Sequence, residues 1–323
     1  MNRRFLLTAA LCVMPLVAQT TAKTPPRKAW TQPHTPDGQP DLQGTWTNAT
    51  ITPFERPVEL SGKASLNADE AAKLEEQAAG NRVDRAPKQG DVGNYNQFWF
   101  DSGTKVVKTR QTSLVIDPPD GRVPVRPEAE AKREYNLAHN GDSYEYMSLW
   151  DRCITRGVPG AMFPAGYNNA YQIVQIPGYV MILSEMIHNA RIIPLDGRPH
   201  LPASLRQWDG DSRGHWDGNT LVVDTVNYNG RGQISTSAAG GRIKGIQQSK
   251  SLHVVERFTR TDADTILYEV SIDDPTVYTK PWKVSIPLGR DPEYTIYEYA
   301  CQEGNYAMTD ILNGARVEEK EAR

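Results

Sequence analysis

The chain has 323 residues, of which 36 are basic and 39 acidic, so its formal net charge near neutral pH is −3. This acidic excess argues against nucleic acids and anionic membranes as partners, because both attract basic surfaces. The length allows one large domain or two smaller ones. Only residues 23–43 are rich in Pro, Thr, Lys and Gln, so we expect an extended lead-in there and a single β-rich domain over residues 44–323.

The first 22 residues have the pattern of a secretory signal peptide. Arg3 and Arg4 precede an apolar run over residues 5–18, and small residues up to Ala22 suit a cleavage site. Both the general secretory route and the twin-arginine route fit this start. We expect cleavage near Ala22 and a soluble protein in the periplasm or outside the cell, because no later apolar run approaches the ~20 residues of a membrane span.

Two short helices and a strand are predicted before residue 140. Asn67 and Glu70 have the spacing of a capping box, which predicts a helix over residues 71–79. A second helix is predicted over residues 127–138. Between the two, the apolar residues 112–117 run into a Pro-Pro-Asp-Gly turn and predict a strand.

At least eight strands are predicted in total, most of them after residue 170. Turn sequences such as Pro177-Gly178, Asp196-Gly197 and Asp217-Gly218 separate apolar runs of strand length. The later predicted strands cover residues 220–227, 252–259, 265–272, 283–288 and 295–302. Short sequential connections favour an antiparallel up-and-down barrel or a strongly curved meander sheet, whereas a β-sandwich would need longer crossing connections.

Two cysteines, Cys153 and Cys301, remain once Cys12 has left with the signal peptide. In an oxidising compartment they could form a disulfide, which would close a loop of roughly 150 residues. The alternative is a pair of buried thiols that pack as small apolar side chains.

Two resemblances add to this pattern. Gly44-Thr45-Trp46 resembles the Gly-x-Trp that opens lipocalins, which implies a lipocalin-like (calycin) barrel closed over a small apolar ligand. The chain is also similar to a family of secreted bacterial proteins of unknown function, which implies secretion but no particular activity. The segments that carry this second resemblance are residues 152–160, 185–200, 210–214 and 297–305.

Glu185 and His188 are the first candidates for catalysis. Charged groups among apolar strand residues need a pairing partner or have a functional role, because burying them unpaired costs several kcal/mol. If the strand after Gly178 is regular, the two side chains point to opposite faces, so a Glu-x-x-His metal pair forms only if a bulge intervenes. We predict His188 as a general acid or base, with Glu185 or Glu298 as the carboxylate beside it.

A structural role is the alternative for each of these groups. His188 would then be a core histidine that hydrogen-bonds a neighbour. The carboxylates of Glu185, Glu298 and Asp224 would pair with arginines, because buried acids are usually held by ionised neighbours. The arginines available for this are Arg152, Arg156, Arg191 and Arg198.

A second candidate cluster lies in the loops between residues 198 and 213. Aromatic rings beside Arg, His and Asp suit carbohydrates and phenolic ligands, because rings supply stacking area while charged groups fix hydroxyls or carboxylates. These residue types are also common in structural turns. With Arg152 as an anion clamp, the predicted substrate-binding residues are Arg152, Arg198, His200, Trp208, Asp211 and Arg213.

No metal site and no cofactor are predicted. No two histidines have a diagnostic ligand spacing. Ser212 lies in a Gly-x-Ser-x-Gly sequence, but the strand-then-helix context of a nucleophile elbow is missing.

Two functions fit these observations. The first is a periplasmic, cofactor-independent lyase, isomerase or hydrolase that acts on a small organic or sugar-like molecule by acid/base chemistry. The second is a lipocalin-like binding protein in which the same groups only orient a ligand. In both cases the expected partner is a small molecule.

Overall fold

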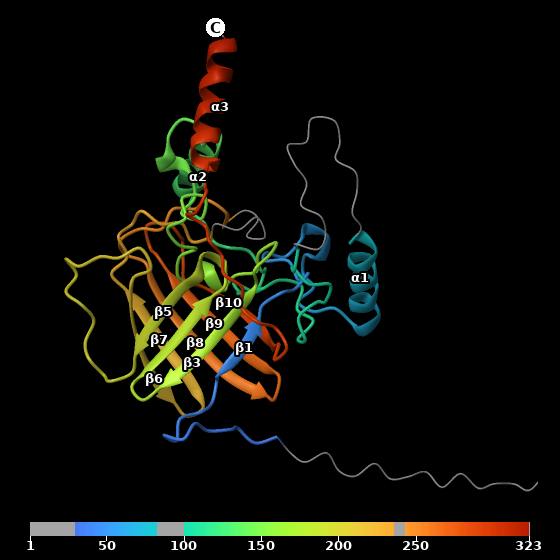
Figure 1. Cartoon of the computed structure of the whole chain (residues 1–323). Helices are drawn as coiled ribbons and strands as arrows, with labels where there is room; N and C mark the ends of the chain where they lie inside the picture. Colours follow the sequence, from blue (N-terminus) through green and yellow to red (C-terminus); the bar gives the residue numbers. More distant parts are fainter. Residues whose placement is uncertain (1–29, 83–99, 236–242, 323) are drawn as a thin grey trace, which may run out of the picture. The chain divides into compact units, whose positions relative to one another are not determined.

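The computed structural model describes residues 30–82, 100–235 and 243–322. The predicted signal peptide and the first part of the lead-in lie outside these residues. In the part of the chain that is described, ten strands form one sheet and three α-helices lie outside it (Figure 1). None of the helices in these ranges is long and apolar enough to cross a membrane.

Nine strands follow one another in the order β5-β4-β3-β1-β10-β9-β8-β7-β6, and each is antiparallel to its neighbours. The sheet curls into a nearly closed up-and-down barrel, which confirms the predicted fold class. The strands are β1 (Gly44–Thr47), β2 (Val115–Asp117), β3 (Ala170–Ile176), β4 (Tyr179–Ser184), β5 (Asn189–Pro194), β6 (Asp211–Asp217), β7 (Thr220–Val226), β8 (His253–Asp262), β9 (Thr265–Asp273) and β10 (Trp282–Arg290). The tenth strand, β2, pairs with one end of β10.

Local sequence explains most of these elements. Hairpin turns need left-handed residues, and Gly178 and Gly218 supply them with φ of 81° and 58°. Helix α1 (Ala68–Asn81) begins with the predicted capping box, in which Asn67 and Glu70 bond reciprocally. Helix α2 (Pro127–Ala138) covers the predicted range and begins with proline, whose fixed φ suits a first helical position.

The prediction of a strand over residues 295–302 is wrong. This segment is irregular, and β10, which precedes it, is already paired with β9 on one side and with β1 and β2 on the other. A helix that was not predicted, α3 (Ala307–Glu321), follows it. Arg316 of α3 donates to the carbonyls of Gly141 and Asp142, at 3.2 Å each.

The barrel has an odd number of strands, and eight successive antiparallel pairings give the end strands β5 and β6 the same direction. An antiparallel ladder therefore cannot close the barrel between these two strands. No backbone ladder joins these two strands in the described ranges. Side chains bridge them instead: Arg191 Nε donates to Ser212 Oγ at 3.0 Å, and Asn189 Nδ2 donates to Asp209 Oδ2 at 2.8 Å. We call this gap the seam. Since β5 and β6 begin at the same end of the barrel, the connection over residues 195–210 runs back to that end.

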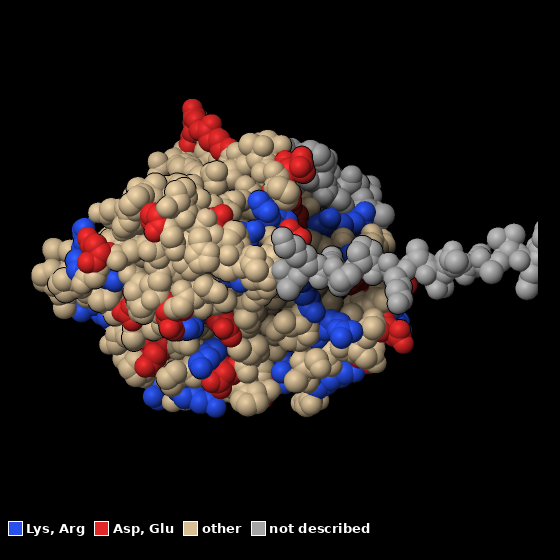
Figure 2. Space-filling model, turned by 90° about the horizontal axis from the view of Figure 1, so that it is seen from below, with Lys and Arg blue, Asp and Glu red and all other residues tan. Residues whose placement is uncertain are grey.

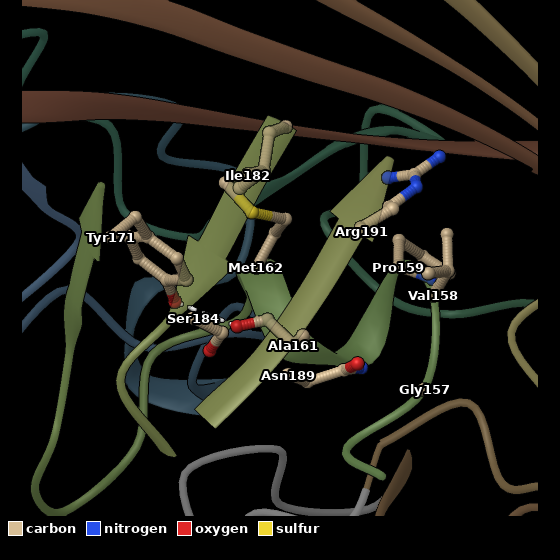
Figure 3. A pocket seen from close by; sticks show the side chains of 10 residues that line it. All are labelled: Gly157, Val158, Pro159, Ala161, Met162, Tyr171, Ile182, Ser184, Asn189 and Arg191. Atoms are coloured by element: carbon tan, nitrogen blue, oxygen red, sulfur yellow. Dashed lines mark hydrogen bonds between the residues drawn. The ribbon is translucent and has the colours of Figure 1, made fainter. Parts of the chain in front are cut away.

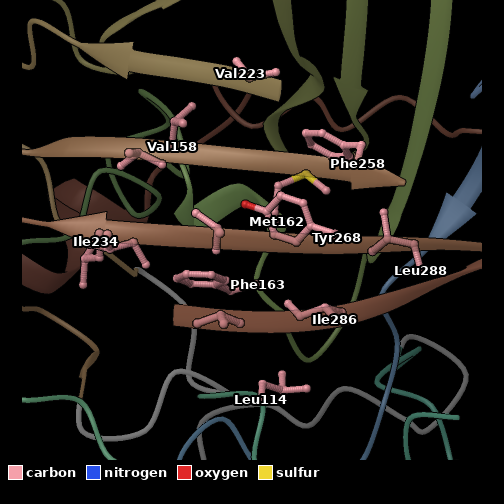
Figure 4. Close-up of a cluster of buried hydrophobic side chains, with 14 of the residues drawn as sticks. Leu114, Val158, Met162, Phe163, Val223, Ile234, Phe258, Tyr268, Ile286 and Leu288 are labelled. Carbon is pink, nitrogen blue, oxygen red and sulfur yellow. The ribbon is translucent and has the colours of Figure 1, made fainter. Parts of the chain in front are cut away.

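The barrel interior is filled by a segment of the chain itself, residues 157–163, which we call the plug. It includes a short 3₁₀ helix, Gly160–Met162. Its side chains Val158, Met162 and Phe163 belong to the main buried cluster, together with apolar side chains of β8, β9 and β10 (Figure 4). Phe163 is fully buried. The described part of the barrel interior around the plug is therefore packed.

A disulfide joins Cys153 to Cys301, with the two Cα atoms 5.5 Å apart. The two cysteines therefore form the disulfide and are not a pair of buried thiols. It fixes the irregular segment after β10 to the loop that precedes the plug.

The outer surface carries charges of both signs. Figure 2 shows one face on which Lys and Arg side chains lie among Asp and Glu side chains in small groups. On this face the charges neutralise one another locally, which weakens any field extending from it.

The fit of the plug can be tested with a single methyl group. A Cβ added at Gly160 would lie 2.7 Å from the backbone carbonyl oxygen of Ile234, whereas a Cβ at Gly289 has no neighbour closer than 3.9 Å. We expect Gly160→Ala to lower the free energy of unfolding by about 1–3 kcal/mol and Gly289→Ala to leave it unchanged or slightly raised. Denaturant unfolding followed by tryptophan fluorescence measures both; equal stabilities would contradict the tight fit.

Candidate functional site

A chain of acidic and basic side chains crosses the outer face of β6, β7 and β8 near the end of the barrel where β6 and β8 begin. Asp211 and Arg213 point outward because they flank the inward-facing Ser212, and Arg213 lies opposite Asp224 in the β6–β7 pairing. Arg213 Nη1 donates to Asp211 Oδ1 at 2.5 Å, and Asp211 Oδ2 lies 3.0 Å from His200 Nδ1. His200 Nε2 lies 2.8 Å from Asp224 Oδ1, and Asp224 Oδ2 lies 2.6 Å from His253 Nε2. We call these five residues the histidine–aspartate network.

His200 is held on both sides by carboxylates. An ionised carboxylate only accepts hydrogen bonds, so both ring nitrogens donate when the ring carries two protons and a positive charge. The Asp211 side chain is only 5% exposed and also accepts from the backbone N–H of Leu201 at 2.8 Å. Both ring nitrogens of His200 therefore face carboxylates, and neither is left for a substrate.

His253 differs from His200 because only one of its ring nitrogens contacts a carboxylate. Its Nε2 donates to Asp224, which fixes the proton on that nitrogen. Its Nδ1 has no hydrogen-bond partner among the residues that the structure describes, and the side chain is 45% exposed. A neutral ring that donates from Nε2 keeps a lone pair on Nδ1. The Asp224–His253 pair thus has the arrangement by which a carboxylate orients a histidine for proton transfer.

A second polar network lies on the inner side of the seam. Arg191 of β5 donates to Glu256 Oε2 of β8 at 2.5 Å and to Thr225 Oγ1 of β7 at 2.9 Å, and Tyr268 of β9 donates to Glu256 Oε1 at 3.0 Å. Glu256 is fully buried. Burial by itself lowers the pKa of Arg191, but the charge of Glu256 and the hydrogen bond to it together raise that pKa above its usual range. The Arg191 guanidinium therefore keeps its positive charge within the barrel.

A small cavity separates the plug from the inner faces of β3, β4 and β5 (Figure 3). Its volume of about 20 Å³ is enough for one water molecule. The lining includes Tyr171, Ser184, Asn189 and Arg191. The buried Ser184 hydroxyl has no hydrogen-bond partner within the described ranges. A water molecule in this cavity would therefore have a hydroxyl with which to form a hydrogen bond.

A third cluster brings together two residues that the sequence assigns to ligand binding. The guanidinium carbon of Arg152 lies 5.9 Å from the ring centroid of Trp208 and 5.1 Å from that of Tyr144. Both distances are within the range of cation–π contacts. Trp208 belongs to the connection that runs back along the seam, and Arg152 precedes the disulfide cysteine Cys153.

The prediction of a regular strand through Glu185 and His188 is wrong, because β4 ends at Ser184. A tight turn follows, in which Ile187 and His188 have φ of 64° and 42°. Such values are rare for a β-branched residue, and tertiary contacts hold the turn in place.

The turn separates its two polar side chains. Glu185 is fully buried; its Oε1 accepts from Asn168 Nδ2 and from the Tyr294 hydroxyl, the latter at 3.0 Å. His188 is exposed, and its Nδ1 donates to the Tyr299 carbonyl at 2.7 Å. No side-chain hydrogen bond joins Glu185 to His188.

The remaining predicted site residues lie apart from these clusters. Glu298 is exposed in the irregular segment after β10. Arg198 is exposed and pairs with Asp196, and its hydrogen bonds hold the pKa of Asp196 at about 2. Arg156 is buried, donates to the Phe163 carbonyl at 3.2 Å, and has its pKa lowered by burial. Glu185 pairs with none of the four arginines considered for it in the described ranges.

The Asp224–His253 contact was not predicted from the sequence. Asp224 lies in the predicted strand 220–227 and His253 at the start of the predicted strand 252–259. Pairing these two strands as antiparallel neighbours would have placed the residues near each other. No group of three or more His, Cys, Asp or Glu side chains in the described ranges has an arrangement that could hold a metal ion.

Compared with known protein families, with curated proteins and with solved structures, the chain matches none of them. The resemblance to lipocalins therefore rests on Gly44-Thr45-Trp46 and on the antiparallel up-and-down barrel.

The inner network predicts a large cost for breaking the Arg191–Glu256 pair. Arg191→Met leaves a fully buried carboxylate without its cation, which costs about 3–5 kcal/mol. Adding Glu256→Leu should recover much of this loss, because no buried charge then remains. Arg257→Met is the matched control: Arg257 pairs with Asp217 on the surface, where a pair contributes about 0–1 kcal/mol. Urea unfolding measures all three, and a cost for Arg191→Met no greater than for the control would contradict the role of the pair.

Proposed function

We propose that this protein is an enzyme that performs acid/base chemistry on a small organic or sugar-like molecule, with His253 as the general base and Asp224 as the residue that orients it. One observation carries the proposal: Asp224 engages Nε2 of His253, Nδ1 has no partner in the described chain, and the side chain is 45% exposed. Lyase, isomerase and hydrolase reactions all use a base of this kind.

The network supports a complete proton cycle. His253 takes a proton from the substrate, or from a water that attacks it, onto Nδ1 and becomes an imidazolium. Asp224 stabilises that charge through the bond to Nε2, as an aspartate does in a catalytic triad. His200 Nε2 lies 2.8 Å from the other oxygen of Asp224 and holds this carboxylate in position. The proton on Nδ1 then returns to the leaving group or to another atom of the substrate.

This assignment moves the acid/base role from His188 to His253. His188 Nδ1 carries its proton toward the Tyr299 carbonyl, and no carboxylate accepts from its ring in the described part of the chain. The buried carboxylate of Glu185 is surrounded by neutral donors.

The second candidate function is binding without catalysis. Its support is the cluster of Arg152, Tyr144 and Trp208, which combines a cation with ring surface. Such a combination recognises small molecules in many binding proteins. Under this alternative the ligand lies at the end of the barrel, outside the packed interior.

Turnover assays on a panel of aryl esters, lactones, glycosides and uronic acids test the proposal. We expect His253→Gln to lower kcat by about 10²–10⁴-fold, as for a lost general base, and Asp224→Asn to lower kcat and shift its pH profile. His188→Gln, on the exposed β4–β5 turn, is the control and should leave kcat unchanged. Turnover that survives His253→Gln refutes the role of His253, and a wild-type protein that binds but converts no member of the panel favours the second candidate.

We also propose that the protein acts in the periplasm or outside the cell. The proposal rests on the signal-peptide pattern in residues 1–22 and on the disulfide, since such bonds persist in oxidising compartments. Protein isolated from a bacterial periplasm should react with a thiol-specific maleimide only after reduction, whereas Cys153→Ser should expose Cys301 to the reagent without reduction. Labelling of the unreduced wild type would contradict the proposal.

A further inference from the structure

Arg152 differs from the other buried or partly buried arginines of the described chain because no protein group there accepts a hydrogen bond from its guanidinium. Every other buried or partly buried arginine in those ranges donates at least one hydrogen bond from its guanidinium, for example Arg191 to Glu256, Arg213 to Asp211 and Arg260 to the Asp41 carbonyl. Arg152 is partly buried, yet its guanidinium donates to no residue that the structure describes. Its five N–H donors are therefore available to a ligand.

The acids nearest to Arg152 along the chain and beside its ring neighbour are already engaged. Asp151 Oδ2 accepts from the backbone N–H and the hydroxyl of Ser148, at 3.2 and 2.7 Å. Asp209, which follows Trp208, accepts from Thr155 Oγ1 at 2.9 Å and from Asn189 Nδ2 at 2.8 Å. Because both carboxylates bond elsewhere, the charge of Arg152 is not neutralised by a direct ion pair with either.

Two aromatic rings lie beside the guanidinium of Arg152. Tyr144 and Trp208 both lie within cation–π distance of its guanidinium carbon. A guanidinium in a cation–π contact can still pair with an anion through N–H groups that no protein atom accepts from. They also provide a flat apolar surface on which the ring of a ligand can lie.

The backbone that carries Arg152 is held in place. Its N–H donates to the Ser148 carbonyl at 3.2 Å, and the next residue, Cys153, is fixed by the disulfide to Cys301. A donor group held in this way loses little freedom when it binds a ligand.

We propose that Arg152, Tyr144 and Trp208 form a binding site for a small molecule that carries a carboxylate on a ring. The edge of a guanidinium matches a carboxylate in a bidentate pair, and the indole and phenol rings accommodate the ring of the ligand. Inorganic phosphate offers no ring surface to Tyr144 and Trp208, so a carboxylate on a ring suits the site better. The site rests on the second candidate function, which it makes more specific, and it requires nothing of His253.

Benzoate is the probe, and benzamide is its neutral analogue of similar shape. Calorimetric or saturation-transfer titration of the full chain should detect benzoate binding, with benzamide at least about ten-fold weaker, because only benzoate pairs with the cation. Arg152→Gln should weaken benzoate binding by about ten-fold or more, and Trp208→Leu by several-fold. Arg231→Gln, at an exposed arginine outside the cluster, is the matched control and should bind as the wild type does.

Several results would overturn the proposal. These are no binding of benzoate by the wild type, equal binding by Arg152→Gln, equal binding of benzamide, or tighter binding of inorganic phosphate than of benzoate at matched ionic strength. Circular dichroism and the thermal midpoint establish that each variant is folded. Arg152→Lys keeps the charge but loses the planar fork, so its affinity should fall between those of the wild type and Arg152→Gln.

Discussion

The buried pair between Arg191 of β5 and Glu256 of β8 holds together the two sides of the gap that the barrel cannot close by a regular ladder. Nine strands with antiparallel neighbours leave β5 and β6 in the same direction, and side chains rather than backbone groups bridge the seam. A cation reaching from β5 to β8 across the interior links both sides of that gap. Because β5 and β6 run in the same direction, the connection over residues 195–210 must return to the end of the barrel where both strands begin. This return places His200, Trp208 and Asp209 at one end of the barrel.

The features that the sequence predicted correctly depend on residues that lie close together along the chain. The capping box at Asn67, the helix over 127–138 and the glycine turns at Gly178 and Gly218 are local devices, and the structure contains all of them. The general fold class followed from their order. Features that depend on distant partners were not predictable in the same way.

The failures have specific physical causes. The strand predicted through Glu185 and His188 stops because the chain must turn back to form β5, and periodicity gave no sign of left-handed residues at Ile187 and His188. The segment 295–302 pairs with none of the described strands, and both sides of β10 before it are already occupied. The contact between Asp224 and His253 depends on the register of two strands, which the spacing of residues along one strand does not contain. The plug was missed because its sequence has neither helical nor strand periodicity.

The disulfide has a consequence for the integrity of the chain. Cys153 precedes β3 and Cys301 follows β10, so the covalent loop that they close contains eight of the nine barrel strands and the whole plug. A protease that cuts once anywhere within this loop produces two fragments that stay covalently attached. The connection over 195–210, with its exposed residues, lies inside the loop. A protein of this design can lose the continuity of its backbone at the site end and still keep its strands together.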